Sequence, residues 1–187
     1  METMKTNSAR GLRNLYFVRT AFQVIWAATV LITARSQPIA AAVLFILYPL
    51  WDVACTVYDL RTSSRSGSAR TSQSINALLG IVAAAGIGLT TFQRPADAVA
   101  IFGAWALGAG VLQLVAGLIR RKQLGGQWAM ILSGAQSTLA GIAYLLGGLS
   151  DKRHIRDVAG YATFGALYFL IAGVLLNKKL SKLSHLA

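Results

Sequence analysis

Six apolar stretches, each of about twenty residues, follow one another along this chain of 187 residues and use up most of it. A helix of about 20 apolar residues spans the hydrocarbon core of a bilayer. Only 13% of the residues are charged, whereas soluble proteins have about 25%. The chain therefore lacks the polar side chains that would coat a water-facing globule. We predict an all-α integral membrane protein, a single membrane domain over residues 1–187. Its six transmembrane helices are expected at about 15–34, 39–58, 75–92, 96–119, 128–149 and 158–176.

The apolar stretches pair into three hairpins that resemble one another, at about 15–58, 75–119 and 128–176. The first two hairpins match at a constant offset of 57, which pairs Thr33 with Thr90, Pro38 with Pro95 and Phe45 with Phe102. Parallel repeats of this kind are related by an axis along the membrane normal. We therefore expect a pseudo-threefold bundle of repeated helical hairpins. Residues 62–74 are rich in Ser and Arg and lack periodicity, which predicts a flexible cytoplasmic linker.

The basic residues indicate which side of the membrane each loop occupies, because cytoplasmic loops carry the excess of Lys and Arg. Twelve of them lie in four segments: before the first stretch, between the second and third, between the fourth and fifth, and after the sixth. The other three loops together hold five. This distribution predicts a multi-pass protein with both termini cytoplasmic. It also argues against nucleic acid as the partner, despite a net charge of +12, because a nucleic-acid binder gathers its basic residues on one folded face. The lipid bilayer is the expected partner.

Two charged residues fall inside the apolar stretches, Arg19 in the first and Asp52 in the second. A carboxylate at the centre of a membrane helix costs about 2.5–3.5 kcal/mol or more, so such residues usually pair, face the bundle interior and mark a functional site. At about 1.5 Å per residue, both groups lie at similar depth on the cytoplasmic side of the midplane. An ion pair between Arg19 and Asp52 is therefore feasible. The two residues serve as a structural latch, as a site for a polar ligand or ion, or in neither way, and the sequence leaves these alternatives open.

Neutral polar residues accompany this pair, most of them in the cytoplasmic half. They are Gln23, Asn76, Gln113 and Gln136. Hydrogen bonds between helices, worth about 0.6 kcal/mol each, are sufficient to explain them. If they instead converge on Asp52, they outline a polar cavity open to the cytoplasm. The sequence leaves both alternatives open.

Small residues recur four positions apart in the third, fourth and fifth stretches, for example at Gly80, Ala84 and Gly88 and at Ser133, Ser137 and Gly141. Such ridges allow helices to approach closely in lipid. We expect them to make contacts within the one bundle, with a face for self-association as the alternative.

Enzyme chemistry finds little support in the sequence. The two histidines are far apart and lie outside the apolar stretches, and the single cysteine, Cys55, lies inside the second. No Cys/His cluster has metal-binding spacing, and no Gly-rich loop is arranged to cradle a phosphate. We therefore expect a non-enzymatic protein without a metal or cofactor.

A family resemblance is carried by the second hairpin. Gly80-Ile81 and Gly86-Ile87 precede a proline turn, and Phe102-Gly103-Ala104-Trp105-Ala106-Leu107 follows with Gly110 and Gln113. This pattern resembles the short repeat of the HdeD-type membrane proteins, and a looser likeness extends over about residues 15–176. The resemblance implies a six-span protein of the bacterial inner membrane associated with acid resistance, in a family mostly of unknown function. The segment Tyr48-Pro49-Leu50-Trp51-Asp52 departs from that pattern.

Three functions remain open from the sequence. The first is an HdeD-type protein that contributes to stress or acid tolerance, with Arg19–Asp52 as an internal latch. The second is a small transporter or channel that uses Asp52 in a cavity facing the cytoplasm. The third is an accessory subunit that docks on a larger membrane complex or on a second copy of itself.

Overall fold

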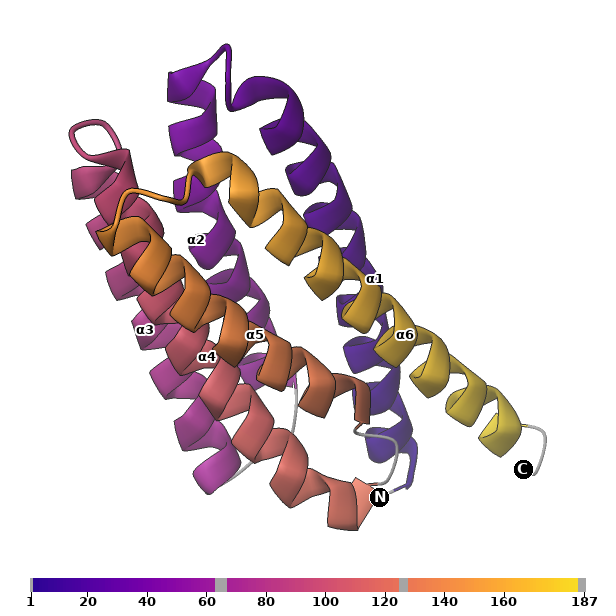
Figure 1. Cartoon of the computed structure of the whole chain (residues 1–187). Coiled ribbons are helices and arrows are strands. Elements are labelled where there is room, and N and C mark those ends of the chain that lie inside the picture. The colour runs from indigo at the N-terminus through magenta and orange to yellow at the C-terminus, as the bar shows by residue number, and fades with distance from the viewer. Residues whose placement is uncertain (1, 63–66, 125–127, 185–187) are drawn as a thin grey trace.

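The computed structural model describes residues 2–62, 67–124 and 128–184, and six long helices make up nearly all of them (Figure 1). They are α1 (Glu2–Thr33), α2 (Pro38–Thr62), α3 (Ser68–Thr90), α4 (Pro95–Leu124), α5 (Trp128–Leu149) and α6 (Val158–Ser184). A short 3₁₀ turn, η1 (Ile155–Asp157), precedes α6. Each of the six is long and apolar enough to cross a membrane. The prediction of an all-helical chain with six helices able to span a membrane is confirmed.

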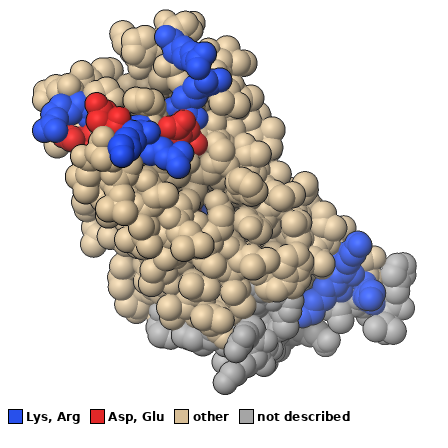
Figure 2. Space-filling model, in the orientation of Figure 1, with Lys and Arg blue, Asp and Glu red and all other residues tan. Residues whose placement is uncertain are grey.

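The outer surface of the bundle fits lipid rather than water. Ile32, Leu89 and Ile39 are 70% or more exposed, and they are three of many large apolar side chains that face outward. Figure 2 shows basic and acidic side chains together near one end of the molecule and basic side chains near the other, with a broad uncharged band between them. Exposed apolar surface of this extent is rare on soluble monomers. The band is the surface expected to meet the hydrocarbon core.

The helices form a ring that follows the order of the chain. Each helix packs against the next one along the sequence, and α6 returns to pack against α1. The helix ends at Glu2, Thr62, Ser68, Leu124, Trp128 and Ser184 all lie at one end of the bundle, here called the terminal end (Figure 1). The three connections at 34–37, 91–94 and 150–154 lie at the opposite end, here called the turn end.

The first two connections at the turn end have the same hydrogen-bond pattern. Gln37 N–H donates to the carbonyl of Thr33 at 2.8 Å, and Arg94 N–H donates to the carbonyl of Thr90 at 2.8 Å. These residue pairs differ by the offset of 57 found in the sequence. The third connection is different, because it is longer and holds Asp151 at φ 54°.

Helices α4 and α5 approach most closely, and glycines spaced seven apart explain why. Gly103, Gly110 and Gly117 on α4 face α5, and Gly134, Gly141 and Gly148 on α5 face α4. A Cβ built on any of the six would lie within 3 Å of an atom of the facing helix, in five cases a backbone atom. Only glycine allows this approach at those positions. We call these six residues the glycine seam; it supports the expectation that small residues serve contacts within the bundle.

Aromatic side chains fill the core in the half of the bundle nearer the turn end. Phe102 packs against Phe45, Tyr48, Trp105, Tyr144 and Tyr161, with ring centroids 5.3–5.9 Å apart. Several of these contacts are edge-to-face, the geometry that aromatic quadrupoles favour. Phe45 and Phe102 are fully buried. These six side chains, here called the aromatic layer, leave the polar residues concentrated toward the terminal end.

Two predictions about helix boundaries need correction. Helix α3 begins at Ser68, so the second half of the predicted linker at 62–74 is helical; residues 63–66 lie outside the described residues. Helices α1, α4 and α6 also extend beyond the apolar stretches at the terminal end. The length of an apolar stretch indicates how much of a helix lipid can surround. The helix itself continues past that stretch wherever the following residues are good helix formers.

Candidate functional site

A cavity of about 180 Å³ opens among the six helices below the aromatic layer, and side chains from every helix line it. The six polar residues singled out in the sequence, Arg19, Gln23, Asp52, Asn76, Gln113 and Gln136, all belong to its lining. All six therefore line one cavity, although only Arg19 and Asn76 among them form hydrogen bonds with Asp52.

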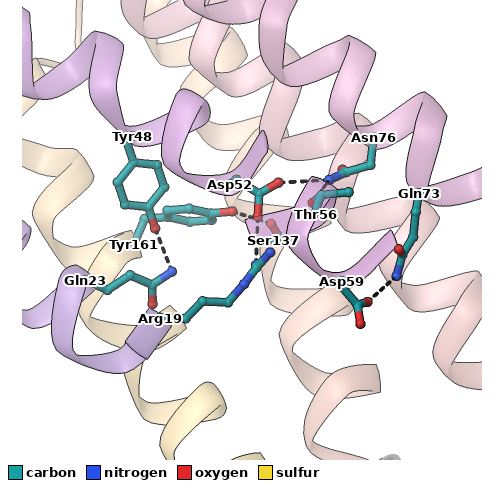
Figure 3. A network of polar contacts seen from close by, with 10 residues as sticks. All are labelled: Arg19, Gln23, Tyr48, Asp52, Thr56, Asp59, Gln73, Asn76, Ser137 and Tyr161. Carbon is teal, nitrogen blue, oxygen red and sulfur yellow. Dashed lines mark hydrogen bonds and ion pairs between the residues drawn. The ribbon is translucent and has the colours of Figure 1, made fainter. Parts of the chain in front are cut away.

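The centre of the cavity holds an ion pair. Arg19 Nη1 on α1 donates to Asp52 Oδ1 on α2 at 2.8 Å (Figure 3). The Arg19 and Asp52 side chains keep 14% and 20% of their surface exposed, so neither is sealed in protein. The guanidinium also lies 5.0 Å from the centre of the Phe169 ring on α6. Arg19 thus links α1, α2 and α6.

Asp52 is held from a third helix as well. Asn76 Nδ2 on α3 donates to Asp52 Oδ2 at 2.8 Å and lies 3.4 Å from the hydroxyl of Thr56 (Figure 3). Charge-assisted hydrogen bonds of this kind are about twice as strong as neutral ones. Each carboxylate oxygen therefore has one donor, and Asp52 is fixed at the meeting point of α1, α2 and α3.

A second group of hydrogen bonds lies where the cavity meets the aromatic layer. Gln23 Nε2 donates to the Tyr48 hydroxyl at 3.2 Å, and the hydroxyls of Tyr161 and Ser137 form a hydrogen bond (Figure 3). Gln23 is 8% exposed and packs against Gly165, where a Cβ would lie 2.8 Å from Gln23 Oε1. These contacts join α1 to α2 and α5 to α6, and they close the cavity toward the turn end.

The remaining two predicted residues have different surroundings. Gln113 Nε2 donates to the backbone carbonyl of Met130 at 3.2 Å, which ties α4 to α5. Gln136 contributes to the lining from α5. Neither residue contacts Asp52 through a hydrogen bond that the structure gives among its described residues, so the network around Asp52 is smaller than the cavity.

The sequence reasoning missed Asp59. Its side chain is buried near the terminal end and accepts a 2.7 Å hydrogen bond from Gln73 Nε2 on α3 (Figure 3). A signal was present, because Tyr48, Asp52, Thr56 and Asp59 are four, four and three residues apart and so share one face of a helix. Asp59 directly follows an apolar stretch, however, and a charge at such a position needs no special explanation.

The cavity reaches toward one end of the bundle. Leu12, Asp59, Gln73 and Gly117 line its lower part, near the terminal end. At the other end Tyr48, Trp105 and Tyr161 belong both to the lining and to the aromatic layer. The structure therefore gives a polar chamber on the side of the terminal end, separated from the turn end by packed rings.

Four side chains of the lining have a buried polar atom without a hydrogen-bond partner among the described residues. They are Gln23 Oε1, Gln73 Oε1, Trp51 Nε1 and Trp105 Nε1. An unsatisfied buried polar group costs about 1–3 kcal/mol, so most proteins keep few of them. The protein therefore carries this cost in the part of the bundle that surrounds the cavity.

Metal chemistry has no support in the part of the chain that the structure describes, where no group of three or more His, Cys, Asp or Glu side chains is placed to hold an ion. No family model, curated protein or solved structure matches this chain. The function is therefore inferred from the geometry and the lining of the cavity.

Proposed function

We propose that this protein binds a small polar solute in the cavity and carries it across the membrane, and that the structure represents the state open toward the cytoplasm. The observation that carries the proposal is the Arg19–Asp52 pair, partly exposed inside a chamber that all six helices line. A transporter requires a site near the membrane interior that is accessible from one side at a time. The aromatic layer supplies the closure on the other side.

A purely structural latch fits the geometry less well. A buried ion pair contributes to stability only with excellent geometry and with its other hydrogen-bonding positions satisfied. Here Arg19 meets Asp52 through one nitrogen only, instead of the two-pronged contact that Arg and carboxylates can form. The unsatisfied atoms nearby add cost without adding contacts. These features support a site kept for a ligand, although the pair also stabilises the bundle.

The direction of opening follows from charge. Basic residues are concentrated in the segments at the terminal end, which supports a cytoplasmic position for that end by the distribution rule for Lys and Arg. We infer that solute enters the cavity of the structure from the cytoplasm, with both chain termini on the same side.

We also propose that the bundle descends from a triplicated hairpin of the HdeD type and resides in a bacterial inner membrane, where it contributes to stress or acid tolerance. The closed ring of helices in chain order is what three hairpins around a pseudo-threefold axis would form. The shared hydrogen bonds of the first two turns add to this interpretation.

Side-specific labelling tests whether the cavity is wet and which side it faces. Ala109→Cys, in a Cys55→Ser background, places a thiol in the lining. A charged, membrane-impermeant methanethiosulfonate should label it in inside-out vesicles and leave it intact in right-side-out vesicles. Leu139→Cys is the matched control, because position 139 is 69% exposed on the lipid face and should not react from either side. Failure to label Ala109→Cys from the cytoplasmic side would contradict the proposal.

A further inference from the structure

We propose that the solute is a small zwitterion, with its anionic group bound by Arg19 and its ammonium or quaternary ammonium group bound by Asp52 and the aromatic wall. The inference rests on the proposed function, since it assigns a chemical class to the solute of that cavity. An α-amino acid and a betaine both belong to this class.

The charges at the centre of the cavity give the first reason. Arg19 and Asp52 form a neutral pair, and a ligand with one charge would either compete for one partner or leave its own charge uncompensated. An uncompensated charge away from water is costly. A zwitterion inserted between the two side chains replaces one ion pair with two, so every charge keeps an opposite neighbour.

The geometry of the pair leaves donors and acceptors for this exchange. A guanidinium has five N–H donors, and the contact with Asp52 uses one of them, on Nη1. A carboxylate accepts about four hydrogen bonds. Asp52 receives one from Arg19 and one from Asn76, on different oxygens. Arg19 can therefore bind a ligand carboxylate while Asp52, still held by Asn76, accepts from a ligand ammonium.

The wall of the cavity suits a cation. Tyr48, Trp51, Trp105, Tyr161 and Phe169 all contribute to the lining. Cations bind the faces of aromatic rings at distances up to about 6 Å. Arg19 already makes such a contact, with Phe169 at 5.0 Å. If a ligand carboxylate draws Arg19 away from Asp52, the released carboxylate and nearby rings form a cationic subsite.

The volume sets the size of the solute. An apolar cavity of about 150 Å³ holds one benzene molecule, and this chamber has about 180 Å³. It therefore accommodates a solute of roughly six to ten non-hydrogen atoms. Small amino acids and betaines fall within that range, whereas peptides and nucleotides do not.

Two sets of matched ligands test the assignment on the purified full-length protein in detergent. Glycine betaine is compared with choline, which lacks the carboxylate, and with 3,3-dimethylbutyrate, in which carbon replaces the charged nitrogen. L-valine is compared with isobutylamine and isovalerate in the same way. Binding is measured as a saturable change in tryptophan fluorescence, because Trp51 and Trp105 line the cavity, and as protection of Ala109→Cys from labelling.

At least one zwitterion should bind at a concentration at least tenfold lower than either of its single-charge analogues. Arg19→Gln and Asp52→Asn should each weaken that binding at least tenfold. Asp97→Asn should leave it unchanged, because the Arg94–Asp97 pair lies at the turn end, outside the chamber. The fluorescence comparison of the ligands uses the unaltered protein, so it decides the question even if a variant fails to fold.

Two results would overturn the assignment: a single-charge analogue that binds as well as its zwitterion, or no saturable binding by either zwitterion. In both cases, labelling of Ala109→Cys from the cytoplasmic side would still support a solute-binding cavity, but one for a different class of ligand. Absence of that labelling would remove the proposed function itself.

Discussion

The glycine seam gives the sharpest quantitative prediction about stability. Gly141→Ala adds one methyl group on α5 at a point where its Cβ would lie 2.3 Å from the backbone nitrogen of Leu107 on α4. Carbon atoms in good contact are about 3.5–4.0 Å from their neighbours, so the two helices would have to separate locally by about 1 Å or more. Backbone cannot rotate away as a flexible side chain can. We expect this overpacking to cost Gly141→Ala about 1–3 kcal/mol of unfolding free energy relative to a Gly→Ala change that meets no clash.

Gly11→Ala is the matched control for this substitution. Gly11 lies inside α1, and a Cβ added there meets no atom within 4 Å. Alanine is favoured over glycine in a helix interior by about 0.8–1.0 kcal/mol, so this variant should be as stable as the natural sequence or more so. Both substitutions replace Gly by Ala inside a helix, so the gain in helix propensity is common to them. The two variants should therefore differ by the cost of overpacking, about 1–3 kcal/mol.

The comparison is made by reversible unfolding in mixed micelles of a mild detergent and dodecyl sulfate, followed by the fluorescence of the four tryptophans. Equal stability of the Gly141→Ala and Gly11→Ala variants would refute the close approach of α4 and α5 and, with it, the role assigned to the glycine seam.

Four other substitutions, at three places, test separate parts of the structure. Arg19→Gln or Asp52→Asn alone should lower stability by about 3 kcal/mol, because each leaves a charge unpaired among the helices, and the double variant should recover part of the loss in a double-mutant cycle; additive losses would contradict the pairing. Phe102→Ala should cost about 3–5 kcal/mol and, by opening the aromatic layer, raise the leak of small solutes from liposomes; unchanged permeability would show that the layer is not the barrier. Asp151→Gly should raise the melting temperature slightly, because a φ of 54° costs a residue with a Cβ about 0.5–1 kcal/mol more than it costs glycine. A fall in melting temperature would contradict that backbone conformation.

The sequence was sufficient to predict some residues of the candidate site but not all of them. Arg19 and Asp52 stood out because charges within apolar stretches demand a partner, and matched depth on adjacent helices identified that partner in advance. The structure places them 2.8 Å apart. Asp59 could not be predicted in the same way, because a charged residue near a helix end is ordinary at a membrane interface. Its place in the site depends on the hydrogen bond from Gln73, which forms only when α3 packs against α2. Ser137 was predicted only as one of a ridge of small residues, and Tyr161 carries no sequence signal of its own, because their hydrogen bond depends on how α5 and α6 meet.

The sequence by itself determined that six helices form and that each is long and apolar enough to span a membrane. Both properties depend on local composition, which sets helix length and the solvent that each segment tolerates. The arrangement of the six around one cavity was decided by the tertiary structure, because it depends on how closely neighbouring backbones can approach. The glycine seam draws α4 and α5 together, while aromatic rings fill the half near the turn end and polar side chains keep the other half open. Whether a polar residue becomes a helix contact or part of a site depends on that uneven packing between the two halves.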